Sequence, residues 1–234
     1  MKLIKKLIIV IILAILVVGT TAVVIFGVPG YNMYKDALEE TPVEEKVASI
    51  KEKKNYSEYA DLPEMYVNAV IAAEDRRFYE HSGIDYIAVI RAIYNDIRAQ
   101  EFVEGGSTIT QQLAKNIYFT QEKSGKRKIA EIFMAAELEK NCEKNEILEL
   151  YVNTSYFGDG YYTVKDACEG YFKKEELSEM TDYECITLAG IPNAPSVYAP
   201  TKNPELTKQR TKQVIRKMVE YGYLKQEEAD KLLK

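Results

Sequence analysis

The chain has 234 residues, of which 47% are hydrophobic and 29% charged, and its formal net charge is −5. This length suffices for one domain with a substantial core and an appendage, and the hydrophobic content excludes a disordered chain. The acidic balance argues against general nucleic-acid binding, which needs a basic domain. We therefore expect a folded protein with no nucleic-acid partner.

The N-terminal segment is the most apolar part of the chain. Three lysines in the first six residues precede an uncharged run that starts at Leu7 and stays apolar to about Val28. Roughly 20 apolar residues span a bilayer core of about 30 Å, and basic residues mark the cytoplasmic side. A cleaved signal peptide is the alternative, but the run is long for one and no clear cleavage site follows. We predict a cytoplasmic tail over 1–6 and an uncleaved single-pass anchor over 7–29, with the remainder extracytoplasmic.

The remainder divides into a charged connection and a helical domain. Residues 30–60 are rich in Glu and Lys, which predicts a stalk with a short helix. From residue 61 to residue 234, helical spacing of apolar residues predominates, so this segment is predicted to be one mainly α domain. Its first helix is predicted to begin with Asp61 as N-cap and Pro63 in the first turn. Further helices are predicted at 85–99, 108–118, 126–141, 144–153, 163–171, 181–190, 204–221 and 226–233, with a proline-rich loop over 191–203.

The chain has three cysteines, Cys142, Cys168 and Cys185, and His81 is its only histidine. No Cys/His spacing is typical of a zinc site. We predict buried free thiols, and a structural disulfide is the alternative.

One carboxylate stands where a core residue belongs. Glu74 shares the apolar stripe of the first predicted helix with Val70 and Phe78. Burying a carboxylate is costly unless it is paired, and carboxyl groups in such places commonly serve as general bases or acids. The alternative is a structural carboxylate neutralised by Arg76, Arg77 or a more distant basic residue. The position alone leaves both interpretations open.

A second carboxylate, Glu131, lies on a predicted helix that is apolar nearly all round. Arg127 and Lys128 precede it by four and three residues. They could form intrahelical ion pairs, worth about 0.2–0.5 kcal/mol each, or could face an anionic ligand together with Glu131. The pattern alone slightly favours the ion pairs.

Between these two carboxylates, a glycine-rich turn leads into a helix. Thr108 and Gln111 fit a capping box, and such a turn presents backbone N–H groups to phosphate. The densest basic stretch of the domain follows, at Lys115, Lys123, Lys126, Arg127 and Lys128. The Gly-Lys-Thr/Ser ending of a Walker motif is absent. A solvated basic loop and a pyrophosphate site are equally compatible with this pattern.

Five blocks in this region resemble the peptidoglycan glycosyltransferases of the penicillin-binding-protein family (glycosyltransferase family 51) in their monofunctional form. They are E-D-x-x-F-x-x-H-x-G at 74–83, G-S-T-I-T-Q-Q at 106–112, R-K-x-x-E at 127–131, E-x-x-E-L-Y-x-N at 146–153, and R-x-x-x-V-x-x-x-M at 210–218. The fourth block has Val152 where Leu is usual, and the fifth has Thr211 in place of a second Arg. The resemblance runs from about residue 63 to residue 218.

The resemblance implies a mainly α, lysozyme-like domain with a membrane-associated jaw around 84–104. It also implies polymerisation of lipid II by an inverting transfer, with formation of a β-1,4 bond and release of polyprenyl pyrophosphate. No Ser-x-x-Lys occurs in the chain, so no transpeptidase activity is expected. The implied partners are lipid II, the growing glycan strand, membrane lipid and other cell-wall synthesis proteins.

The resemblance also implies roles for individual residues. Glu74 would be the general base, and Glu131 a second catalytic carboxylate that organises the pocket or binds a divalent cation, Mg or Mn, which the sequence does not require. The implied pyrophosphate-binding cations are Lys115, Lys123, Arg127 and Lys128. Contacts to sugar or phosphate are implied for Ser107, Thr108, Gln111 and Gln112. Supporting roles fall to Asp75, Phe78, His81, Gly83, Asn153 and Arg210.

Two other functions remain open from the sequence. A membrane-anchored lytic transglycosylase or lysozyme-like hydrolase would share the fold and one key Glu, but it would need no pyrophosphate pocket. A non-catalytic partner in a cell-wall complex would need neither carboxylate.

Overall fold

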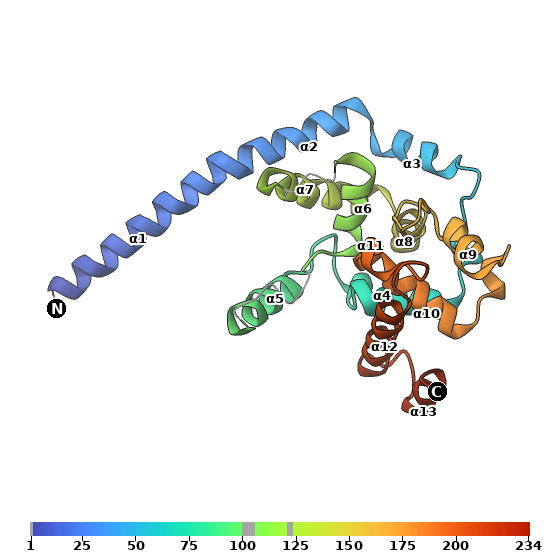
Figure 1. The fold of residues 1–234 in the computed structure, drawn as a ribbon. Coiled ribbons are helices and arrows are strands. Elements are labelled where there is room, and N and C mark those ends of the chain that lie inside the picture. Colours follow the sequence, from blue (N-terminus) through green and yellow to red (C-terminus); the bar gives the residue numbers. More distant parts are fainter. Residues whose placement is uncertain (1, 100–105, 121–123) are drawn as a thin grey trace.

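The computed structural model describes residues 2–99, 106–120 and 124–234, and this part of the chain contains helices and no strands (Figure 1). The mainly α fold that the sequence predicts is therefore confirmed. The long helices are α1 (Lys2–Ala22), α2 (Val28–Glu40), α3 (Val43–Lys51), α4 (Glu64–Glu74), α5 (Tyr86–Ala99), α6 (Ile109–Tyr118), α7 (Gly125–Asn141), α8 (Lys144–Val152), α9 (Val164–Phe172), α10 (Asp182–Gly190), α12 (Pro204–Glu220) and α13 (Gln226–Leu232).

The N-terminal helices form one rod that projects from the domain. A π-helical turn, η1 (Val23–Gly27), joins α1 to α2 without a break. Within the described residues, Ile4–Glu40 is the one helix long and apolar enough to cross a membrane, with a mean hydropathy of 3.2 in its most apolar window and none of that window buried.

The C-terminal end of this rod packs on the domain. Gly30 lies so close to α7 that an added Cβ would stand 2.6 Å from the Ile129 Cβ atom. The Tyr31 ring meets the Phe133 ring edge-on, with centroids 5.1 Å apart. Further along, Lys51 Nζ lies 2.6 Å from Glu146 Oε1 on α8. The residues predicted as a stalk, 30–60, thus run along the domain surface as packed helices, and the predicted domain boundaries stay predictions.

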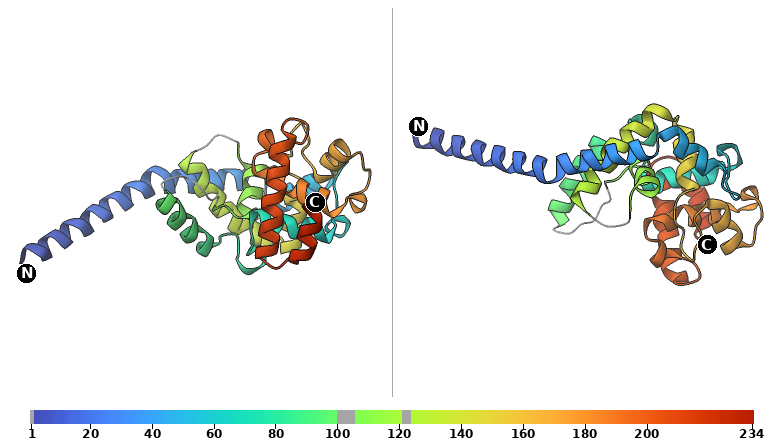
Figure 2. Two further views of the ribbon diagram at one scale, coloured as in Figure 1. Left: turned by 60° about the horizontal axis from the view of Figure 1, so that its bottom comes forward. Right: turned by 90° about the horizontal axis from the view of Figure 1, so that it is seen from above.

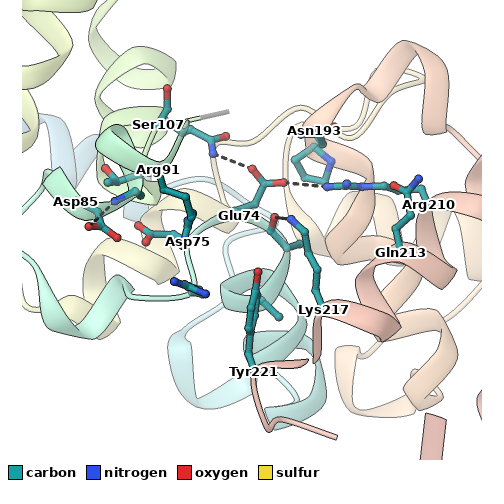
Figure 3. A pocket seen from close by; sticks show the side chains of 18 of the residues that line it. Glu74, Asp75, Asp85, Arg91, Ser107, Asn193, Arg210, Gln213, Lys217 and Tyr221 are labelled. Carbon is teal, nitrogen blue, oxygen red and sulfur yellow. Dashed lines mark hydrogen bonds and ion pairs between the residues drawn. The ribbon is translucent and has the colours of Figure 1, made fainter. Parts of the chain in front are cut away.

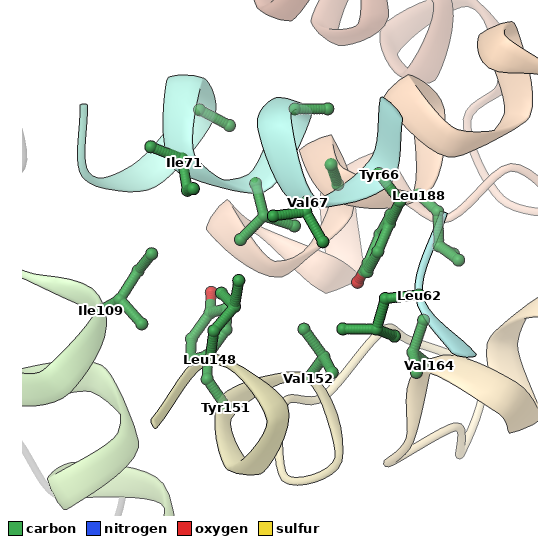
Figure 4. Packing of buried hydrophobic residues seen from close by; sticks show 14 of the residues in the cluster. Leu62, Tyr66, Val67, Ile71, Ile109, Leu148, Tyr151, Val152, Val164 and Leu188 are labelled. Atoms are coloured by element: carbon green, nitrogen blue, oxygen red, sulfur yellow. The ribbon is translucent and has the colours of Figure 1, made fainter. Parts of the chain in front are cut away.

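The core surrounds α4, whose residues are buried on almost every side. Tyr66, Val67 and residues 69–73 are all buried, and they pack against α8, α10 and α12 (Figure 4). Because α4 is enclosed by other helices, its apolar residues are not confined to a single stripe. The three cysteines are buried and free, as predicted. Burial raises the pKa of the Cys142 thiol to about 12.

The structure corrects three local predictions. The Asp61 carboxylate does not cap α4 but accepts a hydrogen bond from the Glu58 backbone N–H (3.0 Å) in a separate 3₁₀ turn, η2 (Tyr59–Asp61). Phe78 is not on α4 either, because that helix ends at Glu74 and Phe78 begins the 3₁₀ turn η3 (Phe78–Glu80). The predicted loop over 191–203 contains two helical turns, η5 (Ile191–Asn193) and α11 (Pro195–Tyr198). Proline is tolerated in a first turn because the N–H that it lacks has no partner there.

Candidate active site

Glu74 is the last residue of α4, and its carboxylate lies at the wall of a cleft (Figure 3). Gln112 Nε2 donates a hydrogen bond of 2.8 Å to Glu74 Oε2. Arg210 Nη2 lies 3.5 Å from Glu74 Oε1, and both side chains are less than 10% exposed. The carboxylate is therefore held between α6 and α12. The sequence suggested that a distant basic residue could neutralise Glu74, and in the structure this residue is Arg210. The ion pair with Arg210 also fixes the Glu74 carboxylate within the cleft.

The cleft has a volume of about 920 Å³ and is bounded by the end of α4, by α5, by the start of α6 and by α12. Several residues singled out in the sequence line it: Glu74, Asp75, Ser107, Thr108, Gln112, Lys115 and Arg210. Arg76, which the sequence offered only as a neutralising partner of Glu74, also lines it, and the lining residues that the sequence reasoning missed include Arg91, Arg98, Asn193, Gln213, Lys217 and Tyr221. The lining residues Arg210, Gln213 and Lys217 on α12, and Tyr221 directly after its last residue, recur at helical spacing. This polar stripe was visible in the sequence, but nothing there indicated which surface it faces.

Asp75 joins the segment after α4 to the start of α6. Its Oδ2 atom accepts a hydrogen bond from the Ile109 backbone N–H (3.1 Å). The same oxygen lies 3.0 Å from His81 Nε2. Both the Asp75 and His81 side chains are buried. His81, the only histidine of the chain, is thus a partner of Asp75, the residue that follows Glu74. His81 itself does not line the cleft.

The start of α6 is fixed by the predicted capping box. The Thr108 side chain accepts from the Gln111 backbone N–H (3.1 Å), and Gln111 Oε1 accepts from the Thr108 backbone N–H (3.2 Å). Thr108 Oγ1 also donates to the Gly83 carbonyl oxygen at 2.7 Å. Gly83 has a φ of +85°, and an added Cβ would lie 3.1 Å from the Ala135 carbonyl group. Gln111 is buried as a helix cap and is not among the residues that line the cleft.

The basic residues of α7 converge on Glu131 and on the edge of the cleft. Lys128 Nζ donates to Ser107 Oγ (2.7 Å) and to Glu131 Oε2 (3.0 Å). Arg127 Nε lies 3.2 Å from Glu131 Oε1. The intrahelical ion pairs therefore form, and Lys128 also reaches the cleft residue Ser107, whereas Arg127 Nη1 donates to the Thr120 carbonyl oxygen (3.0 Å). Lys123 lies outside the described residues.

Lys115 on α6 belongs to this basic group, which we call the α7-side cluster: Lys115, Arg127 and Lys128. Burial lowers the pKa of Lys115, the charges of Arg127 and Lys128 lower it further, and Glu131 and Glu74 oppose the shift. The cluster thus concentrates positive charge around Lys115, which lines the same cleft as Glu74.

The carboxylates of the site do not form a metal centre by themselves. Within the described ranges, no three His, Cys, Asp or Glu side chains gather as a metal-binding group. Both oxygens of Glu131 already face cations, Arg127 and Lys128. The described residues therefore supply no ready set of three such ligands, and the possible divalent cation stays a prediction.

Two of the supporting residues, Phe78 and Asn153, do not line the cleft. Phe78 is fully buried, with Lys144 Nζ 4.4 Å from the centre of its ring. Asn153 accepts from the Ser57 backbone N–H (3.0 Å), and its amide donates to the Ser57 carbonyl oxygen (2.8 Å). Asn153 thereby holds the connecting segment against α8, away from the cleft.

The family model for the transglycosylase family matches residues 41–219. The chain belongs to the transglycosylase family. It is 46% identical over 169 residues to penicillin-binding protein 1F of Bacillus subtilis, and the alignment covers 72% of this chain and 24% of that relative. It is 42% identical over 176 residues to a Cupriavidus necator protein named as a transglycosylase, which covers 75% of each.

The transglycosylase-family chain spans about a quarter of the length of the penicillin-binding proteins that it matches. A crystal structure of penicillin-binding protein 1A from Haemophilus influenzae aligns with a TM-score of 0.45 and 23% identity, over 76% of this chain and 17% of that one. With its apolar N-terminal helix, this member of the family is a membrane-anchored protein.

Proposed function

We propose that the chain polymerises lipid II into peptidoglycan glycan strands by inverting glycosyl transfer. The observation that carries the proposal is that the Glu74 carboxylate and Lys115 line the same cleft. Arg127 and Lys128 lie close enough to Lys115 to lower its pKa, and Lys128 reaches the edge of the cleft at Ser107. Transfer from a sugar pyrophosphate needs these two parts: a base for the attacking hydroxyl and fixed positive charge for the leaving group.

In the proposed reaction, the 4-hydroxyl of one sugar attacks C1 of the sugar linked to pyrophosphate. The new C–O bond forms as the C1–O bond to phosphate breaks, and the bonding electron pair leaves with the pyrophosphate. Glu74 takes the hydroxyl proton as the bond forms, because a neutral hydroxyl is a weak nucleophile. Gln112 and Arg210 hold the carboxylate in one orientation, so little reorganisation is needed during the step.

The α7-side cluster would bind the pyrophosphate and stabilise the charge that it gathers. Lys115 lines the cleft, and Lys128 reaches its edge at Ser107. We propose that Glu131 acts by holding Arg127 and Lys128 in place and not by coordinating a cation, since its oxygens face these two side chains. Ser107 and Gln112 would contact the sugar or the phosphates.

The anchor would place the cleft at the outer surface of the membrane. The basic residues at the N-terminus favour a cytoplasmic start and an extracytoplasmic domain. Helix α5 presents Tyr86 and Ile90 to solvent, with 70% and 68% of their surface exposed. This apolar face and the anchor together would keep the cleft near the lipid-linked substrate, which raises its effective concentration.

The test compares the full chain with its Glu74→Gln variant on lipid II in lipid vesicles. We expect glycan strands from the unchanged protein and a loss of about 10²–10⁴ in rate for the variant, as for removal of a general base. Gln112 can still donate to the amide oxygen of the new side chain, so the variant should stay folded by circular dichroism. Purified sacculi serve as a second substrate: release of muropeptides without any strand synthesis would contradict the proposal and favour a hydrolase.

A further inference from the structure

The cleft has basic residues on both sides of Glu74, and the proposed reaction uses only one side. The second group consists of Arg76 and Lys217, and the amide side chains of Asn193 and Gln213 line the same cleft; we call these four residues the α12 wall. Arg210, also on α12, faces Glu74 itself. In Figure 3, Lys217 and Gln213 lie on the opposite side of Glu74 from Ser107 and Arg91.

The two sides of the cleft lie at different distances from the anchor. Figures 1 and 2 show α5 and α7 on the side from which α1 projects, and α12 farther from α1. Helix α7 also packs directly on the end of the anchor rod, at Gly30. A pyrophosphate joined to a lipid tail stays at the level of the lipid headgroups, so the α7-side cluster suits it. The α12 wall is reached by the part of a substrate that extends away from the lipid.

The chemistry of the α12 wall suits a carboxylate. The Arg76 guanidinium lies over the Tyr221 ring at 5.2 Å, which occupies one flat face and leaves the N–H edge for planar anions. Lys217 Nζ donates to the Ala73 carbonyl oxygen at 2.9 Å, which holds the ammonium group at the end of α4, next to Glu74. Two cations and two amides on one wall match a peptide that ends in a carboxylate.

We propose that the α12 wall binds the carboxylates of the peptide stem carried by the sugar that reacts at Glu74. This proposal rests on the proposed function, because it assumes a substrate that bears a peptide. It divides the anionic groups of that substrate between the two sides of the cleft: phosphates at the α7-side cluster and carboxylates at the α12 wall. The wall would then orient the reacting sugar by its peptide.

The experiment measures binding and polymerisation by the full chain in lipid vesicles with three lipid-linked disaccharides. One carries the intact peptide, one carries the peptide with its carboxyl groups amidated, and one carries no peptide. The variant is Arg76→Gln, and the matched control is Arg216→Gln, an exposed cation on α12 that does not line the cleft.

We expect Arg76→Gln to weaken binding of the intact substrate about three- to tenfold, between the effect of an exposed ion pair and that of a charged hydrogen bond. Binding of the amidated and peptide-free substrates should be unchanged, and so should all binding by the Arg216→Gln control. Amidation alone should weaken binding to the unchanged protein by a similar factor, a result that needs no variant.

Equal weakening of all three substrates by Arg76→Gln would assign the residue to the pyrophosphate that they share and would overturn the proposal. So would equal affinity of the unchanged protein for the intact and amidated substrates. If the unchanged protein binds in the expected pattern but makes no strands, then the proposed function fails and the carboxylate subsite stands.

Discussion

Arg210→Ala removes the cation that faces Glu74 and tests how the carboxylate is held. The guanidinium makes three contacts: Nη2 to Glu74 Oε1 at 3.5 Å, Nε to the Gly190 carbonyl oxygen at 3.2 Å, and the Tyr198 ring at 5.6 Å. Breaking a buried ion pair by removing one partner costs about 3–5 kcal/mol. The long distance to Glu74 and the remaining Gln112 hydrogen bond place the expected loss at the low end, at about 3 kcal/mol.

For a chain of this size, about 3 kcal/mol corresponds to a fall in Tm of roughly 6–12 °C. We expect kcat for strand synthesis to fall as well, because the carboxylate loses one of the two groups that orient it. Thermal unfolding by circular dichroism and initial rates with lipid II measure the two effects separately.

The decisive measurement is a double-mutant cycle between Arg210→Ala and Glu74→Gln. If the ion pair contributes, Arg210→Ala costs at least about 1 kcal/mol less in the Glu74→Gln background than in the unchanged protein. Equal costs in the two backgrounds would show that the pair adds nothing to stability and would refute the reasoning.

Three further predictions concern other parts of the structure. Gly83→Ala should destabilise the domain by about 1–3 kcal/mol in urea unfolding, because the left-handed backbone is strained for alanine and the Ala135 carbonyl is close; an unchanged midpoint would contradict this. The pKa of Lys115 is lowered, so its ammonium group should lose its proton at a lower pH than an ordinary lysine, and the affinity for inorganic pyrophosphate should fall as the pH rises through that pKa. Lys115→Arg should remove this fall in affinity; a fall that persists in the variant belongs to another group. Gly30→Leu should push the anchor rod off Ile129 and reduce the rate of polymerisation in vesicles. The Gly19→Leu variant is the control, since no atom lies within 4 Å of a Cβ added at Gly19. Equal polymerisation rates for both variants would show that the contact between rod and domain does not matter.

The secondary structure was largely predictable because local sequence decides it. The predicted helices at 108–118, 126–141 and 204–221 agree with α6, α7 and α12 within one residue at each end. Thr108 and Gln111 predicted the cap of α6 because a capping box is a contact between residues three apart. Asp61 was assigned to the wrong helix because the same local contact also closes a 3₁₀ turn, and the sequence does not say which of the two follows.

The sequence by itself determined the helices, the apolar anchor and the positions of both unusual carboxylates, because each depends on residues close together in the chain. Only the tertiary structure decided what those carboxylates meet. It brought Arg210 from 136 positions away onto Glu74 and turned the polar stripe of α12 toward the cleft. It also laid residues 30–60 against α7 and α8, where a charged composition had predicted a stalk. Such pairings depend on which faces of distant helices pack together, and helical spacing within one segment carries no information about its partner.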